Sequence, residues 1–314
     1  MYDRNDLIVQ TAILYYKNDK TQTEIANQLG ISRPTVAKFL KEAKETGIVR
    51  ISIQHNSNSY AELTKAIKEN YKLSNVIIVP ASGNNNEDKQ EVGFQCSELI
   101  QSNIKNYRSI GIGWGTTIYE YVQATNYMDS PVKEIVPLIG GIGINDVKYH
   151  SNHLAFQLAE KHHSEVSYFY APAIAENKAV YHAFNSSELV KSVKGKAKAV
   201  DVAVIGIGNP TDPICYRNLG YLTDEEAKMI KQSGAVGDVL ASFFDKEGKE
   251  VDTEFSNRMI GLTIDDLKHI PQVVILATGQ VKTPSIKALL SHPGIVSDII
   301  IDSEIGKLLV EWGR

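Results

Sequence analysis

Seven short runs of Val, Ile and Leu recur from residue 76 onward in this 314-residue chain, and they constrain its fold more than any other feature. Each run is nearly continuous in apolar residues, and stretches of helical periodicity separate successive runs. Continuous apolar runs are typical of parallel strands covered by helices on both faces. The runs are Val76–Val79, Ile110–Trp114, Glu134–Ile139, Val166–Tyr170, Val200–Ile207, Val273–Ala277 and Ile299–Asp302. We therefore predict a doubly wound, mostly parallel, Rossmann-like α/β domain over residues 56–314.

The first 55 residues have a different pattern, that of short capped helices. Thr21 and Glu24 have the spacing of a capping box, in which each side chain bonds the other's backbone N–H. Gly30 is suited to end that helix, and Ser32 is suited to begin the next one. Residues 48–53 then alternate like a strand that could form a wing. Together these features predict a small winged helix-turn-helix domain over residues 1–55.

The distribution of charge favours DNA as the partner of this first segment. Residues 1–56 hold eight Lys and Arg against six Asp and Glu, whereas the whole chain holds 33 against 37. Because one copy carries little positive charge, we expect two or more copies to bind repeated half-sites. The alternative is a packing module whose charged face is merely solvated. The residues predicted to contact DNA are Thr21, Gln22, Ser32, Arg33, Thr35, Lys38, Lys41 and Arg50.

Glycine-rich segments follow several of the predicted strands, where ligands bind in doubly wound domains. In Gly113–Thr117 the glycines let backbone N–H groups converge, and the Thr hydroxyls add donors at a helix N-terminus, which favours an anion. The segment lacks the Lys of a Walker P-loop and misses the spacing of the dinucleotide fingerprint. It fits either a sugar-phosphate site or a tight turn. The candidate effector-binding residues are Gly113, Trp114, Gly115, Thr116, Thr117, Gly140, Gly141, Asp238, Arg258 and Lys282.

Several of these candidates leave two interpretations open. Asp238 precedes a helix-like segment, Val239–Phe243, so its carboxylate either accepts from sugar hydroxyls or caps that helix. Arg258 either holds a phosphate or forms a surface ion pair. The paired glycines Gly140 and Gly141 either admit a ligand close to the backbone or form a turn. Lys282 follows a predicted strand, where its cation would meet a bound anion.

Other chemistry finds little support in the sequence. Two cysteines, Cys96 and Cys215, form no disulfide framework and match no metal-binding spacing. We interpret His150, His153, His162 and His163 as solvated or helix-capping residues rather than metal ligands, and we expect no cofactor. Charged residues stand where a signal peptide needs its apolar stretch, and no apolar run approaches the ~18 residues of a membrane span. We therefore expect a cytoplasmic protein.

The chain resembles the SorC family of bacterial transcriptional regulators in a set of motifs and in their order along the sequence. The motifs are Gln22–Ala26, Ser32–Val36, Gly113–Thr117, Ala235–Asp238, Asn257–Gly261, and Gly279 with Lys282. The resemblance implies a DNA-binding domain joined to a sugar-phosphate-binding and oligomerisation domain related in fold to phosphosugar isomerases. It also implies assembly into dimers or tetramers.

The resemblance assigns roles to individual residues as well. It implies that Gly115, Thr116 and Thr117 hold the phosphate, that Asp238 is an acidic ligand and that Lys282 is a basic one. Deoxyribonucleoside regulators of the family carry a Schiff-base lysine just before the paired glycines. Here that position is Ile139, which has no amine. The expectation is therefore reversible binding of the effector.

These observations lead to one functional hypothesis and one alternative. The hypothesis is a DNA-binding regulator of a carbohydrate-utilisation operon, with operator DNA and a phosphorylated sugar or polyol as partners and with no catalytic residue. The alternative is a phosphosugar isomerase or amino-sugar-phosphate deaminase with an added helix-turn-helix. Such an enzyme needs a general base near the sugar carbons. Asp238 is a candidate base, but spacing alone places no second acid or base beside it.

Overall fold

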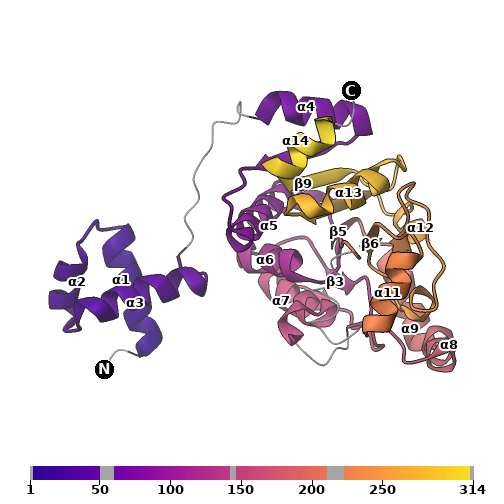
Figure 1. Cartoon of the computed structure of the whole chain (residues 1–314). Coiled ribbons are helices and arrows are strands. Elements are labelled where there is room, and N and C mark those ends of the chain that lie inside the picture. The colour runs from indigo at the N-terminus through magenta and orange to yellow at the C-terminus, as the bar shows by residue number, and fades with distance from the viewer. Residues whose placement is uncertain (1–2, 50–59, 142–145, 211–222, 312–314) are drawn as a thin grey trace. The chain divides into compact units, whose positions relative to one another are not determined.

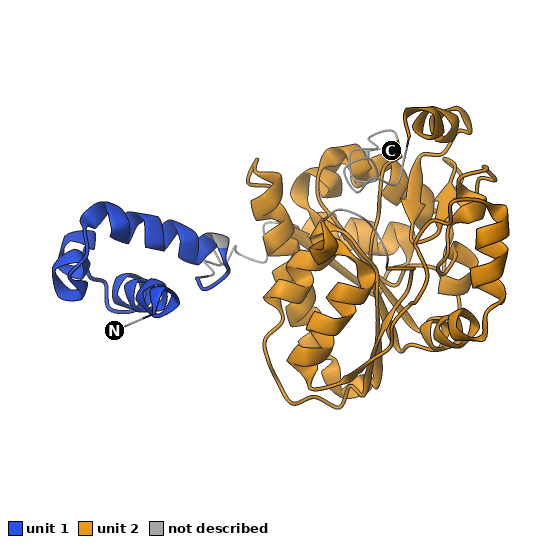
Figure 2. Ribbon diagram, turned by 90° about the horizontal axis from the view of Figure 1, so that it is seen from below, with its two compact units in different colours: residues 1–55 blue, residues 56–314 orange. Residues whose placement is uncertain are grey.

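The computed structural model describes residues 3–49, 60–141, 146–210 and 223–311. The chain divides into two compact units, residues 1–55 and residues 56–314, which Figure 2 shows in different colours. Each unit has hydrophobic clusters of its own. No helix in the described part of the chain has the length and apolar character needed to cross a membrane.

The first unit is a three-helix module with the predicted local signals. Its helices are α1 (Arg4–Tyr16), α2 (Gln22–Leu29) and α3 (Arg33–Glu45). The Thr21 hydroxyl accepts from the N–H of Glu24, and the Glu24 carboxylate accepts from the N–H of Thr21 at 2.8 Å, which completes the capping box. Gly30 ends α2 in the left-handed conformation at φ 67°, and Ser32 caps α3. The predicted helix-turn-helix is confirmed.

An ion pair fastens α1 to α3 beside the core of this unit. Arg4 donates to both carboxylate oxygens of Glu42, at 2.5 and 2.7 Å, while its guanidinium lies over the Phe39 ring. The buried apolar residues of the unit are Ile8, Ala12, Leu14, Ile25, Ala26, Val36, Phe39, Leu40 and Ala43. The predicted wing strand falls mostly on residues 50–53, which lie outside the described residues, as does Arg50.

The second unit is built on a seven-stranded parallel sheet (Figure 1). Its strands are β1 (Asn75–Val79), β2 (Ser109–Ile112), β3 (Glu134–Pro137), β4 (Glu165–Val166), β5 (Val202–Gly206), β8 (Gln272–Ala277) and β9 (Asp298–Asp302). Their order across the sheet is β1-β9-β8-β5-β2-β3-β4. Each of the seven predicted runs overlaps one of these strands, although the run Val166–Tyr170 shares only Val166 with β4. The predicted fold class is confirmed.

Helices cover both faces of this sheet (Figure 1). The α-helices are α4 (Ala61–Tyr71), α5 (Asn85–Ser102), α6 (Thr116–Ala124), α7 (Ser151–His162), α8 (Lys178–Ser186), α9 (Glu188–Lys198), α11 (Asp224–Gln232), α12 (Ile264–Leu267), α13 (Thr283–Leu290) and α14 (Ser303–Glu311). The 3-10 helices are η2 (Ile104–Asn106), η3 (Val147–Tyr149), η4 (Ser256–Arg258) and η5 (Gln280–Lys282).

Two hydrophobic clusters explain why the strands read as continuous apolar runs. Val202 and Val204 of β5 belong to the cluster that contains apolar residues of α5, α6 and α7. Ala203 and Ile205, the alternate residues of the same strand, belong to the cluster with α4, α9, α11, α13 and α14. Successive side chains of a strand point to opposite faces, so a strand buried on both faces needs an apolar residue at every position.

One sequence prediction about this unit is wrong. The segment Val239–Phe243 is not helical but belongs to a hairpin of β6 (Gly237–Val239) and β7 (Ser242–Phe244), in which Asp238 pairs with Phe243. Leu240 takes a left-handed conformation at φ 48° in the turn between the two strands. A short apolar run cannot distinguish a buried helix from a buried strand by periodicity. Asp238 therefore lies inside a strand and caps no helix.

Candidate effector and DNA-binding sites

The glycine-rich segment Gly113–Thr117 lies where the winding direction of the sheet reverses. From β2 the chain builds outward through β3 and β4 to one edge, then returns to pair β5 with the other side of β2 and continues to β8 and β9. Ligands of doubly wound sheets bind outside the carboxyl ends of the strands at such a switch point. The segment directly follows the carboxyl end of β2.

The local geometry of this segment suits an anion. Gly115 takes φ 105°, a backbone conformation that side-chain-bearing residues rarely adopt, and it immediately precedes α6. Its N–H donates to the carbonyl of Tyr149 at 3.0 Å. The N-cap residue of α6 is Gly115, which has no side chain to cap the first turn, and that turn includes Thr116 and the buried Thr117. Backbone N–H groups and the helix dipole favour negative charge at such an end.

The hairpin that carries Asp238 lies beside this segment, although more than a hundred residues separate them in the sequence. Gly208, just beyond the end of β5, donates its N–H to the Asp238 carbonyl at 2.9 Å, and the two residues form a β-bridge. The Asp238 side chain is 5% exposed. Leu240, in the turn of the same hairpin, would lie 3.5 Å from a Cβ atom at Gly113. The hairpin therefore brings a buried carboxylate to the glycine-rich strand end.

Lys282 lies on the next strand end along the sheet. It follows β8, which pairs with β5, and its N–H donates to the Gly279 carbonyl at 3.0 Å. The Asn209 side chain, from the end of β5, donates to the Val281 carbonyl at 2.7 Å and joins the two strand ends. The structure thus gathers the glycine-rich segment, Asp238 and the loop of Lys282 at three neighbouring strand ends.

Asn209 was not among the candidate site residues predicted from the sequence. A polar amide directly after an apolar strand is the signal that could have pointed to it. Its partner could not have been found that way, because Asn209 and Val281 are 72 residues apart.

The paired glycines after β3 pack against the protein itself. Gly140 donates its N–H to the Ile260 carbonyl at 2.8 Å, and a Cβ atom there would overlap with the backbone of Pro172. A Cβ atom at Gly141 would overlap with the side chain of Asn152. Close packing of the chain on itself explains the presence of these glycines, and it is neither of the two interpretations that the sequence had left open. Ile139, just before them, is fully buried.

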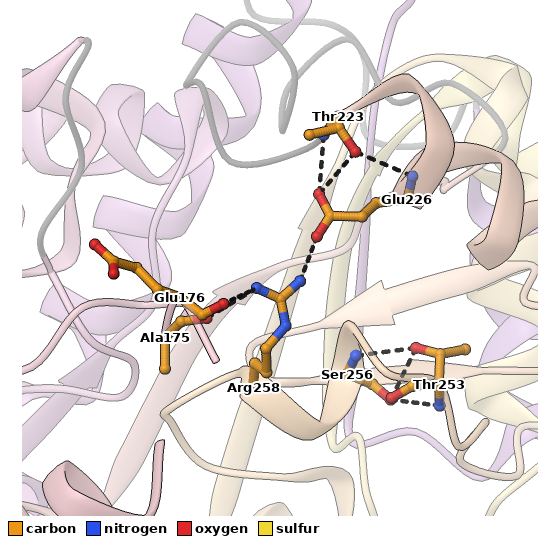
Figure 3. A network of polar contacts seen from close by, with 7 residues as sticks. All are labelled: Ala175, Glu176, Thr223, Glu226, Thr253, Ser256 and Arg258. Atoms are coloured by element: carbon orange, nitrogen blue, oxygen red, sulfur yellow. Dashed lines mark hydrogen bonds and ion pairs between the residues drawn. The ribbon is translucent and has the colours of Figure 1, made fainter. Parts of the chain in front are cut away.

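Arg258 lies in a partly buried network on the same unit (Figure 3). Its guanidinium donates to the carbonyls of Ala175 and Glu176, each at 3.0 Å, and forms an ion pair with Glu226 at the start of α11. The two side chains of the pair are only 14% and 19% exposed. The sequence had left open a phosphate contact or a surface ion pair for Arg258. The structure shows an ion pair with Glu226, which is partly buried and does not lie on the surface.

Glu226 is held in its charged form by this network. Burial raises the pKa of its carboxyl, but hydrogen bonds from the Thr223 backbone and from Arg258 outweigh that effect, so the pKa lies below its usual value. Glu226 also closes a capping box with Thr223, which caps α11 (Figure 3). The network therefore ties the start of α11 to η4 and to residues 175–176.

The predicted DNA-contacting residues that the structure describes are exposed or half-buried. Arg33, Lys38 and Lys41 are exposed on α3, whereas Val36 and Leu40 of the same helix are buried. The hydroxyls of Thr21 and Ser32 are engaged in capping, and Thr35 lies 2.8 Å from the Ser32 hydroxyl. Gln22 is half-buried in the first turn of α2. The exposed face of α3 is thus dominated by cations.

The four histidines noted in the sequence do not assemble. His150 and His162 are buried rather than solvated, at 4% and 2% exposure. The Nδ1 atom of His162 lies 3.2 Å from the Ser130 hydroxyl. Over the described ranges of the chain, no group of three His, Cys, Asp or Glu side chains could hold a metal ion.

A helix-turn-helix unit joined to an α/β unit with a candidate ligand site at its strand ends is the architecture of transcriptional regulators that respond to small molecules. The family model described as "Putative sugar-binding domain" matches residues 55–311, and a winged helix-turn-helix DNA-binding model matches residues 12–50. The chain belongs to this sugar-binding family and, with its helix-turn-helix, to the SorC-type transcriptional regulators.

Relatives and solved structures resemble the chain over nearly its whole length. A deoxyribonucleoside regulator of Bacillus subtilis is 29% identical to this chain, and the match covers 98% of both chains. A sorbitol operon regulator of Klebsiella pneumoniae is 27% identical, and the match covers 97% of this chain and 98% of the relative. The full-length sorbitol operon regulator structure from Klebsiella pneumoniae aligns with a TM-score of 0.76 at 27% identity, over 99% of this chain and 100% of that one. A DeoR family regulator from Listeria monocytogenes aligns with a TM-score of 0.74 at 27% identity, over 80% of this chain and all of the other.

Proposed function

We propose that this transcriptional regulator controls a carbohydrate-utilisation operon and that a phosphorylated sugar or polyol sets its affinity for operator DNA. The proposal gives residues 1–55 the role of binding operator DNA and residues 56–314 the roles of binding the effector and forming oligomers. Relatives named for sorbitol and deoxyribonucleoside regulation support the chemical class of the effector.

One observation carries the proposal for the effector. Three neighbouring strand ends, those of β2, β5 and β8, bring together the N-terminus of α6, whose N-cap is a glycine, the buried Asp238 carboxylate and the loop of Lys282. The helix N-terminus and the lysine suit a phosphate, because both favour negative charge. A carboxylate suits the hydroxyls of a sugar, because it accepts hydrogen bonds and repels phosphate. An effector with a phosphate at one end and hydroxyls along its length matches this arrangement.

The DNA-binding role depends on the exposed cations of α3. Arg33, Lys38 and Lys41 supply charge for phosphates and donors for base edges. Because the net charge of the unit is small, the proposal includes a homodimer or homotetramer that places two or more units on one operator. Sedimentation at micromolar concentration is expected to give a species larger than the 34.7 kDa monomer. A monomer that binds operator with full affinity would contradict this part.

A thermal-shift screen tests the choice of effector. The panel contains the phosphates of glucose, fructose, ribose and sorbitol, each beside its unphosphorylated parent. A compound that binds only the folded protein raises its stability by about 2.7 kcal/mol at ~100 times its dissociation constant. The expected result is a rise in Tm for at least one phosphate and a smaller rise for its parent. The best compound must then change operator affinity in a fluorescence anisotropy titration.

The same panel tests the enzymatic alternative. An isomerase or deaminase would convert its substrate at a measurable rate, whereas a regulator returns the compound unchanged. Incubation of the protein with each phosphate, followed by NMR of the carbohydrate, is expected to show no conversion. Turnover without any effect on operator binding would overturn the proposed function.

A further inference from the structure

The loop that carries Lys282 is held on one side by the neighbouring strand β9. Asp302 ends β9 and is 1% exposed. Its Oδ2 atom accepts the N–H of Gly279 at 2.5 Å, and its Oδ1 atom accepts the N–H groups of Glu304 and Ile305 in the first turn of α14, at 3.0 and 2.9 Å. One buried carboxylate therefore fixes the start of the loop to the start of α14.

The other neighbouring strand, β5, holds the far part of the same loop. The Asn209 amide donates to the carbonyl of Val281 at 2.7 Å, and Val281 directly precedes Lys282. The loop turns at Gly279, the first of its two attachment points, where the φ of 89° is a backbone conformation that other residues rarely adopt. The loop is thus fastened at Gly279 from one side and at Val281 from the other.

This arrangement bears on the free energy of binding an anion. A lysine side chain loses up to about 2 kcal/mol of rotamer freedom when it is ordered. A mobile loop would add the cost of ordering its backbone, whereas a loop that is fixed before the ligand arrives avoids that cost. The Asp302 oxygens are occupied by backbone N–H groups, so Asp302 acts on the loop and not on a ligand.

We infer that Asn209 and Asp302 are positioning residues of the effector site, which hold the backbone of Lys282 where its ammonium meets the anionic group of the effector. The inference rests on the proposed function, because it assumes that Lys282 contacts that group. Loss of the attachment made by Asn209 or of the one made by Asp302 is expected to weaken binding of the phosphate and to leave binding of the sugar hydroxyls unchanged.

A double-mutant cycle on the full chain tests the inference. The variants are Asn209→Ala, Lys282→Ala and the double variant, and the probes are the best-binding phosphate of the thermal-shift panel and its unphosphorylated parent. Loss of one hydrogen bond at the loop is expected to raise the Kd of the phosphate by about 2- to 10-fold in calorimetry. The Kd of the parent is expected to stay the same. In the Lys282→Ala background, Asn209→Ala is expected to have no further effect, because the group that it positions is gone.

The outcomes separate this inference from the proposed function. If Lys282→Ala leaves the Kd of the phosphate unchanged, the proposed phosphate contact and the positioning role fall together. If Lys282→Ala weakens binding but Asn209→Ala does not, or if Asn209→Ala weakens both probes equally, only the positioning role falls. Asp302→Asn serves as the second variant, since it keeps the shape of the side chain, and it must show the same selectivity for the phosphate.

Discussion

The carboxylate of Asp238 fills the space that a side chain at Gly208 would need, so that a Cβ atom on Gly208 would overlap with it. The two residues also form a β-bridge, in which Gly208 donates its N–H to the Asp238 carbonyl at 2.9 Å. Glycine at position 208 therefore sets the place of the carboxylate relative to the end of β5. The position of Asp238 in the candidate site depends on a residue that itself has no side chain.

Replacement of Gly208 by alanine is expected to displace Asp238. The overlap is expected to lower the free energy of unfolding by about 1–3 kcal/mol, as overpacking does, and to weaken sugar binding. Urea denaturation and calorimetry measure the two effects. Gly195→Ala in α9 is the matched control, because in the described structure nothing lies within 4 Å of a Cβ atom there. If Gly208→Ala behaves like this control, Asp238 is not held by the glycine.

Lys282→Ala is expected to remove a charge-assisted contact to the phosphate of the effector. The cost for the phosphorylated compound is about 1.5–3 kcal/mol of binding free energy, with little change in the operator affinity of the unliganded protein. Lys307→Ala, at an exposed lysine of α14, provides the control. Equal losses for the phosphate and its parent would show that Lys282 supports the fold or the sugar ring instead.

Arg33→Ala and Lys38→Ala are each expected to weaken operator binding without changing effector binding. An arginine that reads a base edge is worth about 1–3 kcal/mol and specifies one position, whereas a lysine on a phosphate lowers affinity for all sequences alike. Anisotropy titrations with operator and scrambled DNA distinguish the two roles. Lys65→Ala, on α4 of the second unit, is the control. Parental affinity in both variants at moderate salt would exclude this face of α3 as the DNA surface.

Arg258→Ala is expected to act on stability and not on effector affinity. It removes the donor to one carboxylate oxygen of Glu226 and to two backbone carbonyls, while Thr223 still donates to the other oxygen of Glu226. The expected loss of unfolding free energy is about 3 kcal/mol, at the low end of the cost of breaking a buried ion pair. Lys249→Ala breaks a pair whose side chains are 71% and 58% exposed and is expected to cost at most about 1 kcal/mol. Unchanged stability with reduced effector affinity would instead assign Arg258 to the ligand.

The stability of the second unit is expected to fall as the pH drops below about 6.5. Burial, together with the neighbouring Lys161 ammonium, lowers the pKa of His162 from 6.5 to about 4. Between these two values the unfolded chain binds a proton that the folded chain does not, so stability is complete above pH 6.5 and decreases toward pH 4. The shift corresponds to a loss of at most about 3 kcal/mol.

Denaturation curves across this pH range check the effect of His162. His162→Gln is expected to flatten the dependence on pH. His163→Asn is the control, because His163 is exposed at φ 53° and asparagine tolerates that conformation. A pH dependence that persists unchanged in His162→Gln would assign it to another group.

Features that depend on residues close together in the chain could be predicted from the sequence. The capping box of Thr21 and Glu24 and the helix end at Gly30 involve contacts within a single turn, so local spacing identifies them. The strands of the sheet were identified because burial on both faces requires an apolar residue at every position. Periodicity failed at Val239–Phe243, a short segment with four apolar residues and Ser242, which fits a buried helix and a buried strand equally well.

Which strand ends are neighbours could not be predicted from the sequence, because it depends on contacts between distant parts of the chain. The packing of the β6–β7 hairpin at the end of β5 places Asp238 beside Gly208, and the pairing of β8 with β5 brings Asn209 beside Val281 across 72 residues. The partly buried pair of Arg258 with Glu226 likewise depends on α11 folding back against η4. Such contacts result from the packing of the whole unit around its core, and no pattern of nearby residues specifies them. The sequence therefore identified the glycine-rich segment, Asp238 and Lys282 as candidates, and the packing of the sheet decided that they lie at adjoining strand ends.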